Sequence, residues 1–328
     1  MSSVMSDPTD LMYFGKLPSR GDFVRSPHHA NLIDLVDRWQ SQTMERLSSD
    51  PRWKLTYDSA QPIQFAVLGT GSHVGLAGHW MASQDASGRR FPFVTAASFD
   101  LSLPTQFASL APIALWKTWS RLEQVSRVAH AATDFAHAQA SLHAPMPVNV
   151  SLSGTRVVLQ DFLDTHTVAS LEQMLGAGGG RLVMRQAILA LGLLLQPAMT
   201  MGASRLTRVL RLPLPADAGK RGLVAAWWLS LVLGFFARHE IELGMYLTVH
   251  AEGPQLLLGF QGASAATLHA VIDPVVLSAQ SVSLQQSEWV EGEVLSDHGV
   301  RKLSNYLLDP SLSLAQALSS FQEVFLGV

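Results

Sequence analysis

The stretch IQFAVLGTGSHVGLAGHWM, residues 63–81, decides the fold that we expect for this chain. Two apolar runs, 63–68 and 74–81, flank a Gly-Thr-Gly-Ser sequence, and this composition is typical of a tight turn between antiparallel strands. A polar loop follows over residues 83–90, and a third apolar run spans 93–99. The pattern therefore predicts a hairpin and a further strand in the N-terminal half.

Apolar periodicity places helices on either side of this hairpin. Upstream, a strand-like run over 11–17 ends in a Pro-Ser-Arg-Gly-Asp loop, and a helix is predicted over 30–47. The apolar stripe of that helix consists of Leu32, Leu35, Val36 and Trp39. Downstream, a long helix is predicted to have Pro112 in its first turn and to end near His130.

The second half alternates strands and helices again after the proline-containing segment 143–147, which is the best candidate for a domain boundary. The expected elements are strands near 148–152 and 157–159, a helical region interrupted by glycines at 176–180, a strand over 205–212, a buried helix over 223–238, a hairpin from 245–251 and 255–260, and a helix over 314–325 with Ser313 and Gln316 as a capping box. With residues 1–10 as a disordered lead-in, we predict an α/β protein of two domains, 11–143 and 148–328, the second of α+β type.

The composition favours a globular protein and argues against several functional classes. A chain of 328 residues exceeds what one hydrophobic core usually organises, and 48% hydrophobic residues allow extensive burial. The formal net charge is −3 and the arginines near 205–221 lie in an apolar stretch, so we expect no nucleic acid as partner. The absence of cysteine excludes disulfides and thiolate chemistry. The N-terminus lacks a signal-peptide pattern, and the apolar runs are shorter than the roughly 20 residues of a membrane span, so we expect a cytoplasmic protein without membrane insertion.

The segment 14–23, FGKLPSRGDF, is the densest candidate site, since two cations, a carboxylate, two glycines and a proline share one loop. Its glycines permit a close backbone approach and a positive φ, and its proline fixes its own φ. Either Lys16 and Arg20 present charge to a partner or an anion, or Arg20 and Asp22 pair locally and only hold the loop. The residues alone leave both interpretations open.

A second charged segment, 78–92, contains His79, Ser83 and Asp85, the residue types of a hydrolase triad. A triad needs a base within reach of the nucleophile, whereas alternating strand geometry separates these three residues and the G-x-S-x-G pattern is missing. We therefore interpret the segment as a loop in which Asp85 and Arg89 fix the shape or meet the first loop. The sequence also lacks H-E-x-x-H and P-loop patterns, so no catalytic residue, metal or cofactor is assigned.

Both loops carry a resemblance to a known family. The segment 15–24, GKLPSRGDFV, resembles the opening signature of TagF or ImpM, an accessory family of the type VI secretion system. Further positions that resemble the family are Asp37, Trp39, Trp53, Tyr57, Pro62, Phe65, Gly78, Trp80, Ser83, Asp85, Gly88, Arg89, Phe91 and Pro92. Ala82 stands where the family usually has proline, and the resemblance covers about residues 11–130. The candidate partner-binding or motif residues are Gly15, Lys16, Pro18, Arg20, Gly21, Asp22, Phe23, Trp39, Trp80, Ser83, Asp85, Gly88, Arg89, Phe91 and Pro92.

The resemblance implies a three-layer α/β/α sandwich with a mixed sheet for the N-terminal domain. It also implies a post-translational regulator, usually a repressor, whose partner is the forkhead-associated scaffold protein of the secretion system. Some family members are fused to a phosphatase, but this chain has no such domain, so that activity is not expected. The leading hypothesis is a non-enzymatic binding module. The alternatives are an assembly adaptor or chaperone and, third, an enzyme or small-ligand sensor. The loops 16–22 and 83–90 are predicted to converge on one edge of the N-terminal sheet.

Overall fold

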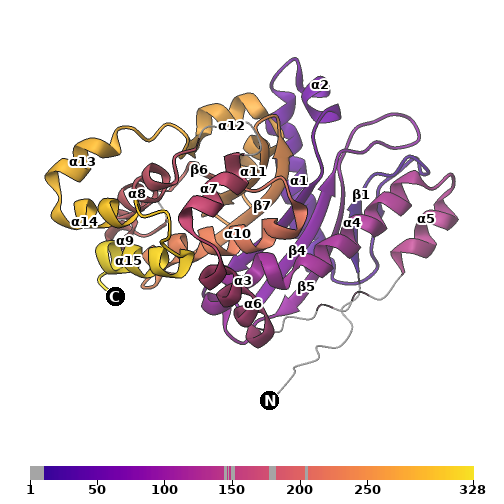
Figure 1. Cartoon of the computed structure of the whole chain (residues 1–328). Coiled ribbons are helices and arrows are strands. Elements are labelled where there is room, and N and C mark those ends of the chain that lie inside the picture. The colour runs from indigo at the N-terminus through magenta and orange to yellow at the C-terminus, as the bar shows by residue number, and fades with distance from the viewer. Residues whose placement is uncertain (1–10, 144–145, 147, 149–151, 177–181, 204–205) are drawn as a thin grey trace.

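The computed structural model describes residues 11–143, 146, 148, 152–176, 182–203 and 206–328, and their strands form one nine-stranded sheet (Figure 1). The strands are β1 Met12–Gly15, β2 Val24–Arg25, β3 Ile63–Gly69, β4 Val74–Met81, β5 Phe93–Asp100, β6 Val209–Pro213, β7 Glu242–His250, β8 Gly253–Gly259 and β9 Ser281–Ser283. Their spatial order is β2-β1-β5-β4-β3-β7-β8-β6-β9. All neighbours are antiparallel except β6 and β9, so the sheet is mixed.

Helices make up most of the remaining described chain. They are α1 Ala30–Ser48, α2 Trp53–Asp58, α3 Pro104–Ala114, α4 Trp116–Ala131, α5 Phe135–Leu142, α6 Leu152–Thr165, α7 Val168–Gly176, α8 Met184–Leu195, α9 Ala198–Met201, α10 Ala218–Val232, η2 Leu233–Phe236, α11 Ala265–Ile272, α12 Pro274–Gln280, α13 Val290–Ser296, α14 His298–Tyr306 and α15 Leu314–Leu326. Within the described part of the chain, no helix has the length and apolar character needed to cross a membrane.

The hairpin predicted from residues 63–81 is confirmed as β3 and β4, which pair from Ile63 opposite Trp80 to Leu68 opposite Gly75. Successive side chains of a strand point to opposite faces of the sheet, and each face of β3 and β4 carries buried apolar residues. Gly78 makes room for the Phe65 ring, because a Cβ atom on Gly78 would lie 2.1 Å from that ring. These strands are therefore central elements of the sheet with a core on each side.

Helices cover both faces of the sheet. On one face, α1, α2, α11 and α12 enclose a core that includes Val36, Trp39 and Leu268. On the opposite face, α3, α4, α10 and α15 contribute to a larger core that includes Trp119 and Trp228. The sheet thus lies between two helical layers, the arrangement expected for the N-terminal part (Figure 1).

The sheet continues from the N-terminal into the C-terminal half of the chain. β3 and β7 pair antiparallel through six residue pairs, from Gln64 opposite Leu247 to Gly69 opposite Glu242. The described residues therefore form a mixed α/β protein around one sheet, and they show no division into a sandwich domain and a separate α+β domain. The expected boundary segment 143–147 and the lead-in 1–10 lie mostly or wholly outside the described residues.

Most elements predicted for the second half are confirmed. The second hairpin is β7 and β8, and the predicted buried helix is α10 followed by η2. Helix α15 begins with the expected capping box, in which Ser313 and Gln316 each bond the other's backbone. The strand predicted over 205–212 begins at Val209 as β6. Of the predicted helix break at 176–180, Gly176 ends α7 and residues 177–180 lie outside the described residues.

The strand predicted at 157–159 is wrong, because these residues lie inside α6. Leu159, Phe162 and Leu163 bury one stripe at helical spacing, while Val157 and Val158 point outward and are exposed. The two adjacent β-branched residues favoured a strand locally, but burial of the stripe decides the outcome. The neighbouring strand prediction at 148–152 falls largely outside the described residues, and Leu152 already begins α6.

Two helix details also differ from the prediction. Pro112 lies near the C-terminal end of α3, whose first turn is occupied by Pro104 instead. The predicted long helix is therefore two, α3 and α4, with a break at Leu115. In α1, Val36 and Trp39 are buried as predicted, but Ile33 replaces Leu35 in the buried stripe.

Candidate functional site

The two charged loops meet at one end of the sheet, where β1, β4 and β5 end or begin. Gly15 of β1 and Met81 of β4 both pair with Phe93, the first residue of β5. The first loop (residues 16–23) and the second loop (residues 82–92) therefore start from β1 and β4, the two strands that flank β5. The amide of Ala86 donates to the carbonyl of Arg20 at 2.9 Å, which ties the loops together. The predicted convergence of the two loops is confirmed.

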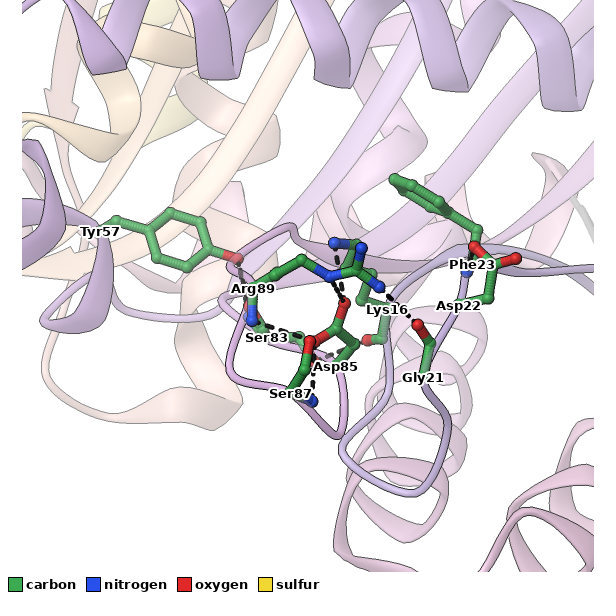
Figure 2. A network of polar contacts seen from close by, with 9 residues as sticks. All are labelled: Lys16, Gly21, Asp22, Phe23, Tyr57, Ser83, Asp85, Ser87 and Arg89. Carbon is green, nitrogen blue, oxygen red and sulfur yellow. Dashed lines mark hydrogen bonds and ion pairs between the residues drawn. The ribbon is translucent and has the colours of Figure 1, made fainter.

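Asp85 is the centre of the contact between the loops (Figure 2). Its side chain is fully buried, and one carboxylate oxygen accepts from the amide and hydroxyl of Ser87 at 3.0 and 2.7 Å and from the amide of Arg89 at 3.0 Å. The other oxygen lies 2.7 Å from Arg89 Nε and 3.0 Å from Lys16 Nζ. Burial alone would raise the pKa of this carboxyl. The hydrogen bonds from Ser87, Arg89 and Lys16 outweigh that effect and hold the pKa well below its usual range.

The two cations bound to Asp85 have different surroundings. The Lys16 side chain is only 9% exposed and its amine lies 5.0 Å from the centre of the Phe23 ring. The Arg89 side chain is 63% exposed, and its Nη2 donates to the carbonyl of Gly21 at 2.6 Å. Lys16 is thus a structural cation inside the junction, whereas Arg89 reaches over the surface and fixes the end of the first loop.

Ser83 is a second, buried contact between the loops. Its hydroxyl donates to the Lys16 carbonyl at 2.6 Å, and its backbone amide and carbonyl both bond the hydroxyl of Tyr57 at 2.8 Å. A serine whose proton is donated to a buried carbonyl has no base that could activate it. Among the described residues, no group of three histidine, aspartate or glutamate side chains is arranged to hold a metal ion. The arrangement of Ser83 is that of a structural contact.

The tip of the first loop (residues 20–23) is the exposed part of this junction. The Arg20 guanidinium lies 4.4 Å from the centre of the Phe135 ring of α5, and no ion pair joins it to Asp22 in the described structure. Asp22 instead accepts from the Phe23 amide at 2.8 Å. Phe23 is 41% exposed although its ring stacks on Phe14 at 5.6 Å. The tip therefore offers a cation, a carboxylate and an aromatic ring to solvent.

Backbone conformation at two glycines allows the loops to approach each other. Gly15 has φ +134°, and a Cβ atom there would lie 1.9 Å from the Pro92 carbonyl oxygen. Gly88 has φ +80°, which allows the turn that brings Arg89 back to Asp85. Pro92 and Phe91 are buried, and Phe91 packs against Phe23 with ring centres 4.8 Å apart. Pro18 is partly buried in the first loop.

Two of the predicted residues lie in the core rather than in the loops. Trp39 packs on Phe65 with ring centres 5.2 Å apart. Trp80 is fully buried, and its Nε1 donates to the side-chain oxygen of Gln40 at 2.9 Å. The other predicted residues lie in or beside the two loops. Tyr57, Ser87 and Phe135 belong to the junction but were not among the predicted site residues, although Tyr57 was one of the positions that resemble the family. The Asp-Ala-Ser spacing at 85–87 was a usable signal, since such side chains commonly bond a backbone amide two residues on.

Comparisons with known proteins agree with the resemblance seen in the sequence. Residues 12–144 match the family model described as the TagF N-terminal domain, type VI secretion system-associated. Among solved structures, the crystal structure of PA0076 from Pseudomonas aeruginosa PAO1 matches with 24% identity and a TM-score of 0.35. That match covers 42% of this chain, and the chain spans only 64% of the length of PA0076. No curated protein matches the sequence.

Proposed function

Because residues 12–144 match the TagF N-terminal domain of the type VI secretion system-associated kind, we propose that this chain is a non-enzymatic cytoplasmic regulator of such a system. It acts as a post-translational repressor by binding the forkhead-associated scaffold protein. The tip of the first loop is the contact surface. The observation that supports this proposal is the buried Asp85 junction. It holds the loop tip, with the exposed Arg20 and Phe23, in one fixed arrangement.

A fixed tip favours binding because little conformational entropy is lost when a partner docks on it. Two backbone carbonyls of the tip accept hydrogen bonds: that of Arg20 from the Ala86 amide, and that of Gly21 from the Arg89 side chain. Arginine and aromatic residues contribute a large share of the binding energy at protein interfaces. Arg20 and Phe23 are residues of this kind, and both remain accessible.

The experiment compares binding and stability in the same variants. Truncating a hot-spot residue costs about 2 kcal/mol or more, which is more than tenfold in affinity. Arg20→Ala and Phe23→Ala should weaken binding to the purified scaffold protein at least tenfold in biolayer interferometry. The melting temperature of Arg20→Ala should stay within a few degrees of the wild type, because this side chain is exposed. Phe23→Ala also loses the ring contacts with Phe14 and Phe91, so its melting temperature should fall, and its affinity is compared at a temperature at which it is folded.

Two further variants serve as references. Arg52→Ala removes an exposed arginine that pairs with Asp50 beside α2, and it should change neither quantity. Arg89→Ala removes a partner of the buried Asp85 and a bond to Gly21, so it should lower both affinity and melting temperature. Unchanged scaffold affinity in both tip variants would refute the proposed surface. Binding to another component of the apparatus, and not to the scaffold, would support the adaptor alternative instead.

A further inference from the structure

A second feature lies on the sheet face that is covered by α4 and α10. There a cleft of about 320 Å³ is lined from the N-terminal half by residues of β3, β4 and α4, and from the C-terminal half by residues of α10 and β7. Ligand sites commonly form where two parts of a fold meet. This cleft is in the size range of a small-molecule site and contains none of the loop residues described above.

His79 of β4 lines the cleft, and nothing in the described structure satisfies its ring. The side chain is 1% exposed, and neither ring nitrogen has a hydrogen-bond partner among the described residues. Burial, together with the charge of Arg127, lowers its pKa to about 4, so the imidazole is neutral at neutral pH. A neutral imidazole offers one donor and one acceptor. Buried polar groups without a partner are rare, and each one needs an explanation.

Two arginines, one from α4 and one from α10, complete the polar lining. Arg127 of α4 pairs with Glu123, which also accepts from the Gln64 amide at 3.1 Å. Arg221 of α10 donates through Nε and Nη2 to the carbonyls of Pro215 and Ala216. Its Nη1 has no hydrogen-bond partner within the described part of the chain. With two guanidinium groups and one carboxylate, the lining has a net charge of +1.

We propose that this cleft binds a small organic anion that carries a carboxylate or phosphate group. Arg221 and Arg127 hold the oxyanion, because planar guanidinium groups suit carboxylate and phosphate oxygens. His79 supplies a hydrogen bond to a second polar atom of the ligand once the lining shifts to expose a ring nitrogen, since both nitrogens are buried in this structure. The exposed part of the Trp116 ring in the wall accommodates an apolar portion. The proposal does not depend on the tip of the first loop or on any partner protein.

Binding of such an anion should stabilise the folded protein, because the ligand has no site on the unfolded chain. The probes are phenyl phosphate, benzoate and inorganic phosphate, with benzyl alcohol as the neutral control. At millimolar concentrations, at least one anion should raise the melting temperature in a saturable way, whereas benzyl alcohol should not. A larger response to phenyl phosphate than to inorganic phosphate would assign a role to the apolar wall.

The variants test the assigned residues. Arg221→Gln should weaken binding of the responding anion at least tenfold. It also removes the hydrogen bonds to the Pro215 and Ala216 carbonyls, so each variant's response is measured against its own ligand-free melting temperature. His79→Gln keeps a neutral polar group and should weaken binding less. Arg52→Gln is the matched control and should bind as the wild type does. The proposal is overturned if none of the three anions gives a saturable response. It is also overturned if Arg221→Gln and the wild type respond equally, since that would indicate binding elsewhere.

Discussion

Replacing Gly15 by alanine tests the contact on which the meeting of the two loops depends. The new Cβ atom would lie 1.9 Å from the Pro92 carbonyl oxygen and 2.9 Å from Phe93 Cα, and both are backbone atoms that cannot rotate away. The φ of +134° is also one that alanine rarely adopts. Backbone strain of this kind costs about 1–3 kcal/mol. Overpacking adds about 1–3 kcal/mol, so the free energy of unfolding should fall by about 2–6 kcal/mol.

Alanine substitutions at two other glycines separate the cost of backbone strain from the cost of overpacking. Gly88 has a positive φ, but no atom lies within 4 Å of the position that a Cβ atom would take there, so Gly88→Ala should show the conformational cost alone, about 1–2 kcal/mol. Gly21 has neither a positive φ nor a neighbour within 4 Å, and Gly21→Ala should stay within about 0.5 kcal/mol of the wild type. Urea denaturation followed by tryptophan fluorescence and by circular dichroism measures all three. A Gly15→Ala variant as stable as Gly21→Ala would refute the close approach of β1 to Pro92.

Three further predictions concern buried polar contacts. Asp85→Asn should be less stable than the wild type. The pKa of Asp85 in the folded protein is held below the unfolded value of about 4. The ionised carboxylate therefore contributes its full stabilisation above about pH 4, and this contribution is lost as the pH falls further. The difference in urea midpoint between the wild type and Asp85→Asn should shrink below that pH, and a constant difference would contradict the assignment. Trp80→Phe removes the donor to Gln40 in the core and should cost about 1–3 kcal/mol in addition to the lost volume; an unchanged urea midpoint would show that this bond does not matter. Ser83→Ala leaves the Lys16 carbonyl without its donor and should cost about 1–3 kcal/mol, while ester hydrolysis by the wild type stays at background; turnover that disappears in this variant would indicate a catalytic serine.

The hairpins and the loop junction could be predicted because their signals are local. Strict runs of apolar residues on either side of a glycine-rich turn indicated β3 and β4, and a similar pattern indicated β7 and β8. Turn-forming residues and charges of both signs in two loops, each joining a strand to the next element, indicated that the loops meet. Asp85 was expected to fix the shape of the second loop or to meet the first loop, and in the structure it does both, through Arg89 and Lys16.

Long-range pairings could not be predicted. No pattern near Gln64 indicates that β3 pairs with a strand more than a hundred residues later, because register between distant strands depends on the whole fold. The hydroxyl of Tyr57 bonds Ser83, which lies 26 residues later in the sequence. The Phe135 ring that contacts Arg20 belongs to α5, far from the first loop in the sequence. The contact of Arg20 with an aromatic ring was not among the expected alternatives, because it depends on the position of α5.

The pairing of β3 with β7 makes the two halves of the chain depend on each other for folding. If the chain were cut within residues 144–151, β3 would become an edge strand whose backbone amides and carbonyls had lost six residue pairs of the ladder. Exposed edges of this kind recruit other strands and promote aggregation. The C-terminal half therefore covers, through β7, a strand edge of the N-terminal half that would otherwise be open to pairing with other chains. A protein built in this way should unfold in one cooperative transition.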